Sequence, residues 1–159
     1  MLGWVSLLAG SATLEHDGVP GALTLDSPVQ EGDVLRTGPN ASLHVVLTAE
    51  TGFALAADSE LRVARLRCGE TELALAHGRV SNRVQKLGER ERYQVMSADL
   101  TASVRGTRFW VARPLAEPQI TVFVAEGRVD VSRGDTLLSS LTAGQSFPAA
   151  RSAAPGDTH

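Results

Sequence analysis

The stretch VFVAEGRVDV, residues 122–131, decides the fold. After the glycine, Val129 and Val131 alternate with charged residues, which is the period of two that a half-buried strand requires. Before the glycine, residues 122–125 are apolar at every position, which favours a central strand covered on both faces. Gly127 separates the two runs, and a glycine lets the backbone turn sharply. The stretch therefore predicts a strand, a glycine turn and a second strand.

The same arrangement recurs along the chain. Residues 76–80 read AHGRV and residues 125–129 read AEGRV, while residues 32–35 read GDVL and residues 134–137 read GDTL. In each of these runs a glycine lies between two extended segments. Such repeats predict stacked hairpins or successive coils, although they are too short to define a strict period.

Alternation and turn signals fill most of the remaining sequence. Residues 43, 45 and 47 are apolar and their neighbours are polar, so His44 is expected on the surface. Residues 54–66 read as two strands divided at Asp58, and turn signals recur about every eight to twelve residues. We therefore expect an all-β fold with little or no helix, as an antiparallel two-layer sandwich of jelly-roll type. A short β-solenoid is the alternative.

Length and composition indicate how many domains the chain forms. The 159 residues are 43% apolar and 21% charged, which is typical of one globular domain. We expect this domain to span residues 1–147, and residues 148–159, which lack an apolar period, to form a flexible C-terminal tail. Fifteen basic and eighteen acidic residues give a net charge of −3, which argues against nucleic acid as a partner.

The sequence gives few signals of location. No stretch approaches the roughly 18 to 20 apolar residues that a membrane-spanning helix needs, so no membrane span is expected in this chain. Residues 1–10 are apolar but lack a basic region, which makes them a poor signal peptide. If the protein is exported, we expect its targeting segment outside this chain. The single cysteine, Cys68, is compatible with either redox compartment.

Groups for catalysis do not gather in the sequence. The four histidines are scattered at positions 16, 44, 77 and 159, so no metal ligand set is apparent. Cys68 has no histidine near it in sequence, and no Gly-x-Ser-x-Gly motif is present. We expect a protein that is not an enzyme and that binds no metal or cofactor.

The combination of three motifs is more specific than any motif alone. Residues 104–111 read VRGTRFWV, residues 125–129 read AEGRV, and residues 141–145 read LTAGQ. In this order, after GDVLRTG at residues 32–38, they resemble the FecR domain family over roughly residues 3–147. The sequence departs from the family pattern at positions where turns are expected, such as residues 49–52. The resemblance implies an exported all-β module that serves signalling in the bacterial cell envelope.

The resemblance also assigns roles to residues. A structural role is implied for the motif positions Arg105, Gly106, Thr107, Phe109, Glu126, Gly127, Val129 and Gly144. Along the strand, Phe109 is expected to face one side, while Arg108 and Trp110 face the other as candidate partner contacts. If Arg105 is partly buried, Glu126 and Asp33 are its candidate partners.

The expected function is a non-catalytic binding and signalling module that contacts other envelope proteins, with edge-strand pairing as one possible mode. The identity of these proteins does not follow from the sequence. The alternative is a domain that binds an envelope glycan, either peptidoglycan or another polysaccharide, through aromatic side chains.

Overall fold

The computed structural model describes residues 2–85, 87–88, 91–114 and 119–148. These residues form fourteen strands and contain no helix, so the all-β prediction is confirmed. No helix in the described ranges is therefore long and apolar enough to cross a bilayer. The strands are β1 (Gly3–Ala9), β2 (Ala12–His16), β3 (Val19–Ala22), β4 (Pro28–Val29), β5 (Val34–Thr37), β6 (Ser42–Val46), β7 (Gly52–Leu55), β8 (Glu60–Arg67), β9 (Glu70–Val84), β10 (Arg92–Ser97), β11 (Leu100–Arg113), β12 (Thr121–Arg133), β13 (Thr136–Thr142) and β14 (Ser146–Phe147).

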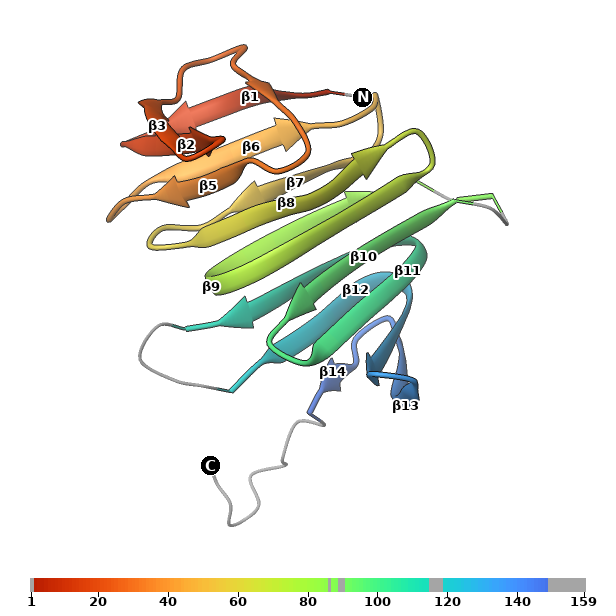
Figure 1. Cartoon of the computed structure of the whole chain (residues 1–159). Helices are drawn as coiled ribbons and strands as arrows, with labels where there is room; N and C mark the ends of the chain where they lie inside the picture. The colour runs from red at the N-terminus through yellow and green to blue at the C-terminus, as the bar shows by residue number, and fades with distance from the viewer. Residues whose placement is uncertain (1, 86, 89–90, 115–118, 149–159) are drawn as a thin grey trace.

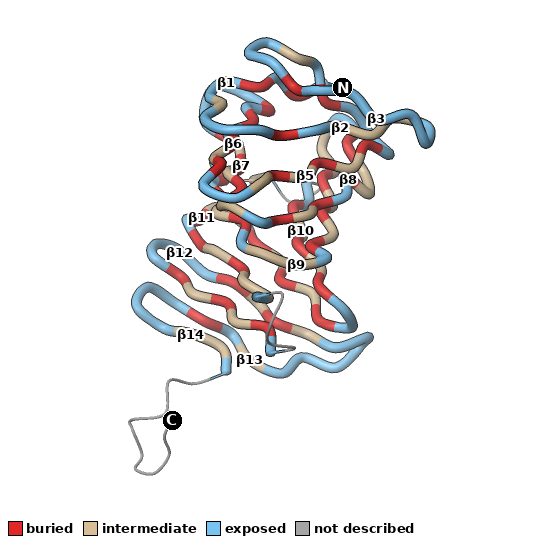
Figure 2. The backbone as a smooth tube through the Cα atoms, turned by 90° about the vertical axis from the view of Figure 1, so that its left-hand side faces the viewer, coloured by how far each residue is buried: buried red, intermediate tan, exposed pale blue. Residues whose placement is uncertain are grey.

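Three long strands bend so that each contributes to both layers of the domain. The first half of β9, residues 70–77, pairs with β8 and β10, whereas its second half, residues 78–84, pairs with β7 and β11. Strand β11 bends near Gly106 and β12 bends at Gly127 in the same way. Figure 2 shows the two resulting columns of strands, with buried segments along the strands of both columns.

We call the two columns the first and the second layer. The first layer contains β4, β1, β6, β7, the second halves of β9 and β11, the first half of β12, and β14. The second layer contains β3, β2, β5, β8, the first half of β9, β10, the first half of β11, the second half of β12, and β13. In Figure 1 the chain passes from β1 at one end of this stack to β13 and β14 at the other.

All the described strand pairs are antiparallel except one, because β9 and β10 run parallel. The expectation of a purely antiparallel sandwich is therefore corrected at this pair. A parallel pair needs a crossover rather than a hairpin, and accordingly β9 ends at Val84 in the first layer whereas β10 begins at Arg92 in the second. The strand order follows the chain order through most of the stack and does not confirm jelly-roll connectivity.

Glycine is required at the bends of β9 and β12. Gly78 has a φ of 97° and Gly127 a φ of 84°, a backbone region that residues with a Cβ rarely adopt. The chain also approaches closely at both bends: a Cβ at Gly78 would lie 2.5 Å from Ser59 Cα, and one at Gly127 would lie 2.9 Å from Thr107 Cα. The repeated AHGRV and AEGRV motifs thus mark the points where a long strand passes from one layer to the other.

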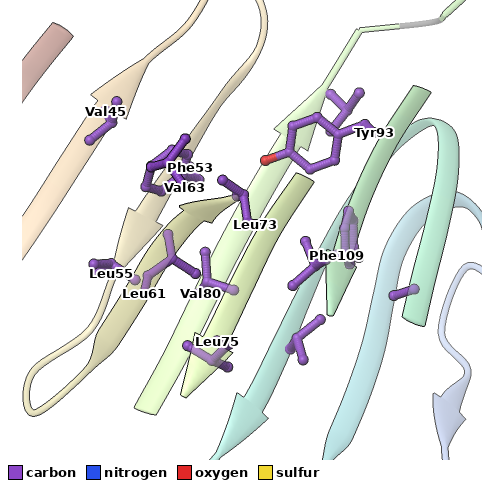
Figure 3. Close-up of a cluster of buried hydrophobic side chains, with 14 of the residues drawn as sticks. Val45, Phe53, Leu55, Leu61, Val63, Leu73, Leu75, Val80, Tyr93 and Phe109 are labelled. Atoms are coloured by element: carbon purple, nitrogen blue, oxygen red, sulfur yellow. The ribbon is translucent and has the colours of Figure 1, made fainter. Parts of the chain in front are cut away.

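The core between the layers is mainly aliphatic, and a buried hydrogen bond links the two layers. Valine and leucine side chains from both layers fill it, as Figure 3 shows for the region around β9. Tyr93, only 2% exposed, donates a 2.7 Å hydrogen bond to Asn82 Oδ1, which joins the second layer to the first. The Tyr93 ring also meets Phe109 edge-on, with centroids 6.4 Å apart. Burial raises the pKa of the Tyr93 phenol well above its ordinary value, so the phenol stays a hydrogen-bond donor.

Candidate functional site

The outer face of the first layer carries a groove of about 480 Å³. Residues of β6, β7, β9 and β11 line it, together with the turn at residues 48–51. A second hollow of about 710 Å³ shares Glu50, Arg83 and Arg108 with the groove and continues toward the bends at Gly106 and Gly127. The face therefore offers a continuous depression rather than a flat sheet surface.

Cross-strand pairing arranges the outward side chains of this face in two rows. Each row takes one residue from each of β6, β7, β9, β11 and β12. The first row consists of Val46, Gly52, Arg83, Arg108 and Glu126. The second row consists of His44, Ala54, Ser81, Trp110 and Phe123.

The groove results from the sizes of the side chains in these rows. Gly52, Ala54 and Ser81 are small and lie in the middle of the face. Larger side chains lie on both sides of them, with His44 and Val46 on β6 and Trp110 and Arg108 on β11. Because neighbouring strands are about 4.8 Å apart, a strip of small residues on two adjacent strands leaves a trough wide enough for an extended chain.

Trp110 is half-buried and held from both sides of its strand. Its ring stacks on Phe123 of β12, with centroids 5.6 Å apart and planes at 26°. From β9, the guanidinium of Arg79 lies 5.5 Å from the centre of the indole ring. These contacts fix the orientation of the indole, so it forms a rigid wall of the groove.

Arginines provide the charge of the groove. Arg108 Nε lies 3.4 Å from Glu126 Oε1 on the neighbouring strand β12. Arg83 is the register partner of Arg108 on β9, so two like charges stand directly opposite each other. Among the described residues, no acidic group lies within 4.0 Å of the Arg83 guanidinium. Like charges in directly opposed positions disfavour strand pairing, and of the two arginines Arg108 has the Glu126 carboxylate beside it.

The other motif residues lie at the bends and in the core. Phe109 and Val129 are buried, and Thr107 Oγ1 donates a hydrogen bond to the carbonyl oxygen of Glu126, which ties β11 to β12 beside Gly127. Gly144 lies in the turn between β13 and β14 with a φ of 85°. The side chain of Arg105 lies outside the described part of the structure. The structural roles that the family resemblance implies for these positions stay predictions.

Asp33 is buried and is held by two hydrogen bonds. It is 1% exposed, and its carboxylate accepts hydrogen bonds from His16 Nδ1 at 2.6 Å and from the Gln30 backbone N–H at 2.8 Å. Its partner is therefore a histidine of the adjoining β2–β3 hairpin. This contact orders the turn that leads into β5.

The contact between His16 and Asp33 predicts a pH dependence of stability. The hydrogen bond to Asp33, aided by the charges of Asp17 and Asp33, raises the pKa of His16 above its ordinary value. Because the pKa of His16 is higher in the folded state than in the unfolded state, the contact stabilises the fold fully at pH values below the unfolded-state pKa. This stabilisation is lost as the pH rises through the folded-state pKa. Urea denaturation at about pH 5.5 and about pH 8.5 should show this loss, and His16→Gln should reduce it. An unchanged pH dependence in His16→Gln would contradict the assignment.

Several groove residues were not identified from the sequence. His44 was expected on the surface and Trp110 and Arg108 as contacts, and all three line the groove. Ala54, Ser81 and Arg83 were missed, because their place beside Trp110 depends on the register between β7, β9 and β11. The one available signal is the alternation of Arg79, Ser81 and Arg83 along β9, which marks an outward face.

In the part of the chain that the structure describes, side chains that could bind a metal ion do not cluster. Within the ranges that the structure describes, no three histidine, cysteine, aspartate or glutamate side chains come together in a way that could hold an ion. Cys68 is exposed in the turn between β8 and β9.

Comparison with known proteins places the chain in a family. A search of the curated proteins returned no match. Two crystal structures of a "putative anti-sigma factor" from Parabacteroides distasonis ATCC 8503 share the fold, each with a TM-score of 0.60 and 16% identity over 71% of this chain. The chain corresponds to 52% of the length of those structures. The family model described as FecR protein matches residues 33–130, well over half of the chain, and the chain therefore belongs to the FecR protein family.

Proposed function

We propose that this chain is a non-catalytic signalling module of the bacterial cell envelope that acts through contacts with other proteins. Membership of the FecR family supports a signalling role, and the shared fold includes a protein named as an anti-sigma factor. We further propose a periplasmic or envelope location. The module consists of one β domain over residues 1–147 and a tail over residues 148–159.

The groove on the first layer is the observation that carries this proposal. It combines a rigid aromatic wall, a floor of small residues and arginines at one end, the mixture that is typical of protein recognition sites. Its depression of about 480 Å³ follows two strands, a shape that suits an extended polypeptide.

Site-specific photo-crosslinking tests this function. A photoreactive amino acid at Ser81, on the groove floor, should crosslink one discrete envelope protein in native membranes. Excess unlabelled chain should compete, whereas the variant Ala54→Phe, which fills the groove, should not. The matched control is the same probe at Arg62, which faces outward from β8 in the second layer. Equal labelling from both positions would contradict a groove-directed contact.

The same experiment separates protein binding from glycan binding. Sugars bind aromatic residues chiefly by stacking on an open ring face, but the Trp110 ring is contacted by Phe123 and Arg79 from the two flanking strands. This arrangement favours a protein partner. If soluble peptidoglycan fragments abolish crosslinking at Ser81 and bind the chain directly, the glycan alternative replaces the proposal.

A further inference from the structure

We infer that the groove recognises an extended segment with an acidic side chain and an apolar side chain two positions apart. This inference rests on the proposed function, since it specifies the partner chemistry of the same groove. It combines three features of the first layer: the spacing of Arg108 and Trp110, the opposed arginines, and the groove that Gly52, Ala54 and Ser81 line beside them.

The spacing follows from the strand itself. Arg108 and Trp110 are two positions apart on β11, so their side chains emerge from the same face about 6.8 Å apart. Arg83 and Ser81 repeat this spacing on β9, one strand away. A partner chain that lies extended along the trough has its own side chains on one face at the same interval. Residue i of the partner therefore lies over the first row, which contains Arg83 and Arg108, and residue i+2 lies over the second row, which contains Trp110.

The requirement for an acidic side chain in the partner comes from the two arginines of the first row. Arg83 and Arg108 stand directly opposite each other, and Glu126 lies beside Arg108 alone. Three arginines, at positions 83, 108 and 128, and two glutamates, at positions 50 and 126, line the groove and the adjoining hollow, and Arg79 lies over the Trp110 ring. A carboxylate from a partner would relieve the repulsion between Arg83 and Arg108 and could accept hydrogen bonds from both guanidinium groups.

The space for that carboxylate is the part of the groove that Gly52, Arg83 and Arg108 line. Gly52 is the register partner of Arg83 on β7, and a Cβ there would lie 2.5 Å from the backbone oxygen of Val45 on β6, so glycine is required where the two strands approach. One position along, the floor formed by Ala54 and Ser81 beside the Trp110 ring offers an apolar seat. The site for the acidic side chain in the first row and the site for the apolar side chain in the second row are thus adjacent.

Peptide selection tests the inference. A displayed library of random heptapeptides would be selected on the whole chain. We expect enriched peptides to carry Asp or Glu two positions from an apolar residue, and selection on Arg83→Glu to replace the acid by Lys or Arg. Arg83→Gln should weaken the best peptide about tenfold. Arg62→Gln, on the outer face of the second layer, is the matched control and should leave its affinity unchanged.

The outcomes separate this inference from the proposed function. Peptides that bind through the groove, as shown by their loss with Ala54→Phe, but carry no acid would overturn the acidic motif and leave the groove as a protein site. If acidic peptides bind equally well to Arg83→Gln and to the parent chain, the motif is also overturned. If nothing that depends on the groove is enriched, the motif fails and the proposed protein-binding function loses its site as well.

Discussion

Replacing Gly127 by alanine should lower the free energy of unfolding by about 3 kcal/mol or more. The backbone at Gly127 has a φ of 84°, which costs a residue with a Cβ about 1 to 2 kcal/mol. A Cβ there would also overlap the carbonyl oxygen of Gly106 and lie 2.9 Å from Thr107 Cα. These are backbone atoms of the adjacent bend, so β11 and β12 would have to separate. Chemical denaturation followed by circular dichroism measures the loss.

Gly144 provides a matched control for this substitution. Its φ of 85° is nearly the same, but a Cβ at Gly144 would meet no atom within 4 Å. Gly144→Ala should therefore cost only the part that comes from the backbone conformation, about 1 to 2 kcal/mol. Equal losses in the two variants would show that the close approach of the bends does not contribute, contrary to the structure. Gly127→Ala could also prevent folding altogether, and this outcome would agree with the larger expected effect.

The second large effect is expected from Phe109→Ala, which should cost about 3 to 5 kcal/mol. The Phe109 ring is 3% exposed and lies between the layers, where it contacts the edge of the Tyr93 ring. Its removal leaves a cavity next to the buried hydrogen bond between Tyr93 and Asn82. In a domain of this size each kcal/mol lowers the melting temperature by roughly 2 to 4 °C, so thermal melting detects the change readily.

Trp110→Ala is the appropriate comparison, because Trp110 follows Phe109 directly and faces outward. It loses only the stacking with Phe123 and the contact with Arg79, so we expect a cost of about 1 to 2 kcal/mol. A larger loss for Trp110→Ala than for Phe109→Ala would mean that the two faces of β11 have been assigned the wrong way round.

The strands were predictable from the sequence because alternation is a local property. The division of residues 54–66 at Asp58 is confirmed: β7 ends at Leu55, β8 begins at Glu60, and Asp58 has a positive φ of 54°. The apolar stretch 122–125 was expected to be covered on both faces, but only Val122 and Val124 are fully buried. Phe123 reaches the outer face, where the Trp110 ring rather than a second layer covers it.

The arrangement of the strands could not be predicted, since it depends on contacts between distant segments. The repeats around Gly78 and Gly127 indicated sharp turns, yet they do not show that a single strand bends from one layer into the other. The parallel pairing of β9 and β10 has no local signature either. The groove has the same origin, because Gly52, Ser81 and Trp110 become neighbours only through the register of three strands.

The bends have a consequence for how such a domain can diversify. The interior is held by one set of positions along each strand and by the glycines at the bends, while the alternate positions of the first layer form the groove. Under the proposed function, recognition and stability therefore depend on separate residues of the same strands. Substitutions at positions such as 54, 81 and 83 should change the proposed binding at little cost to folding, so a shared scaffold can acquire new specificities one outward side chain at a time.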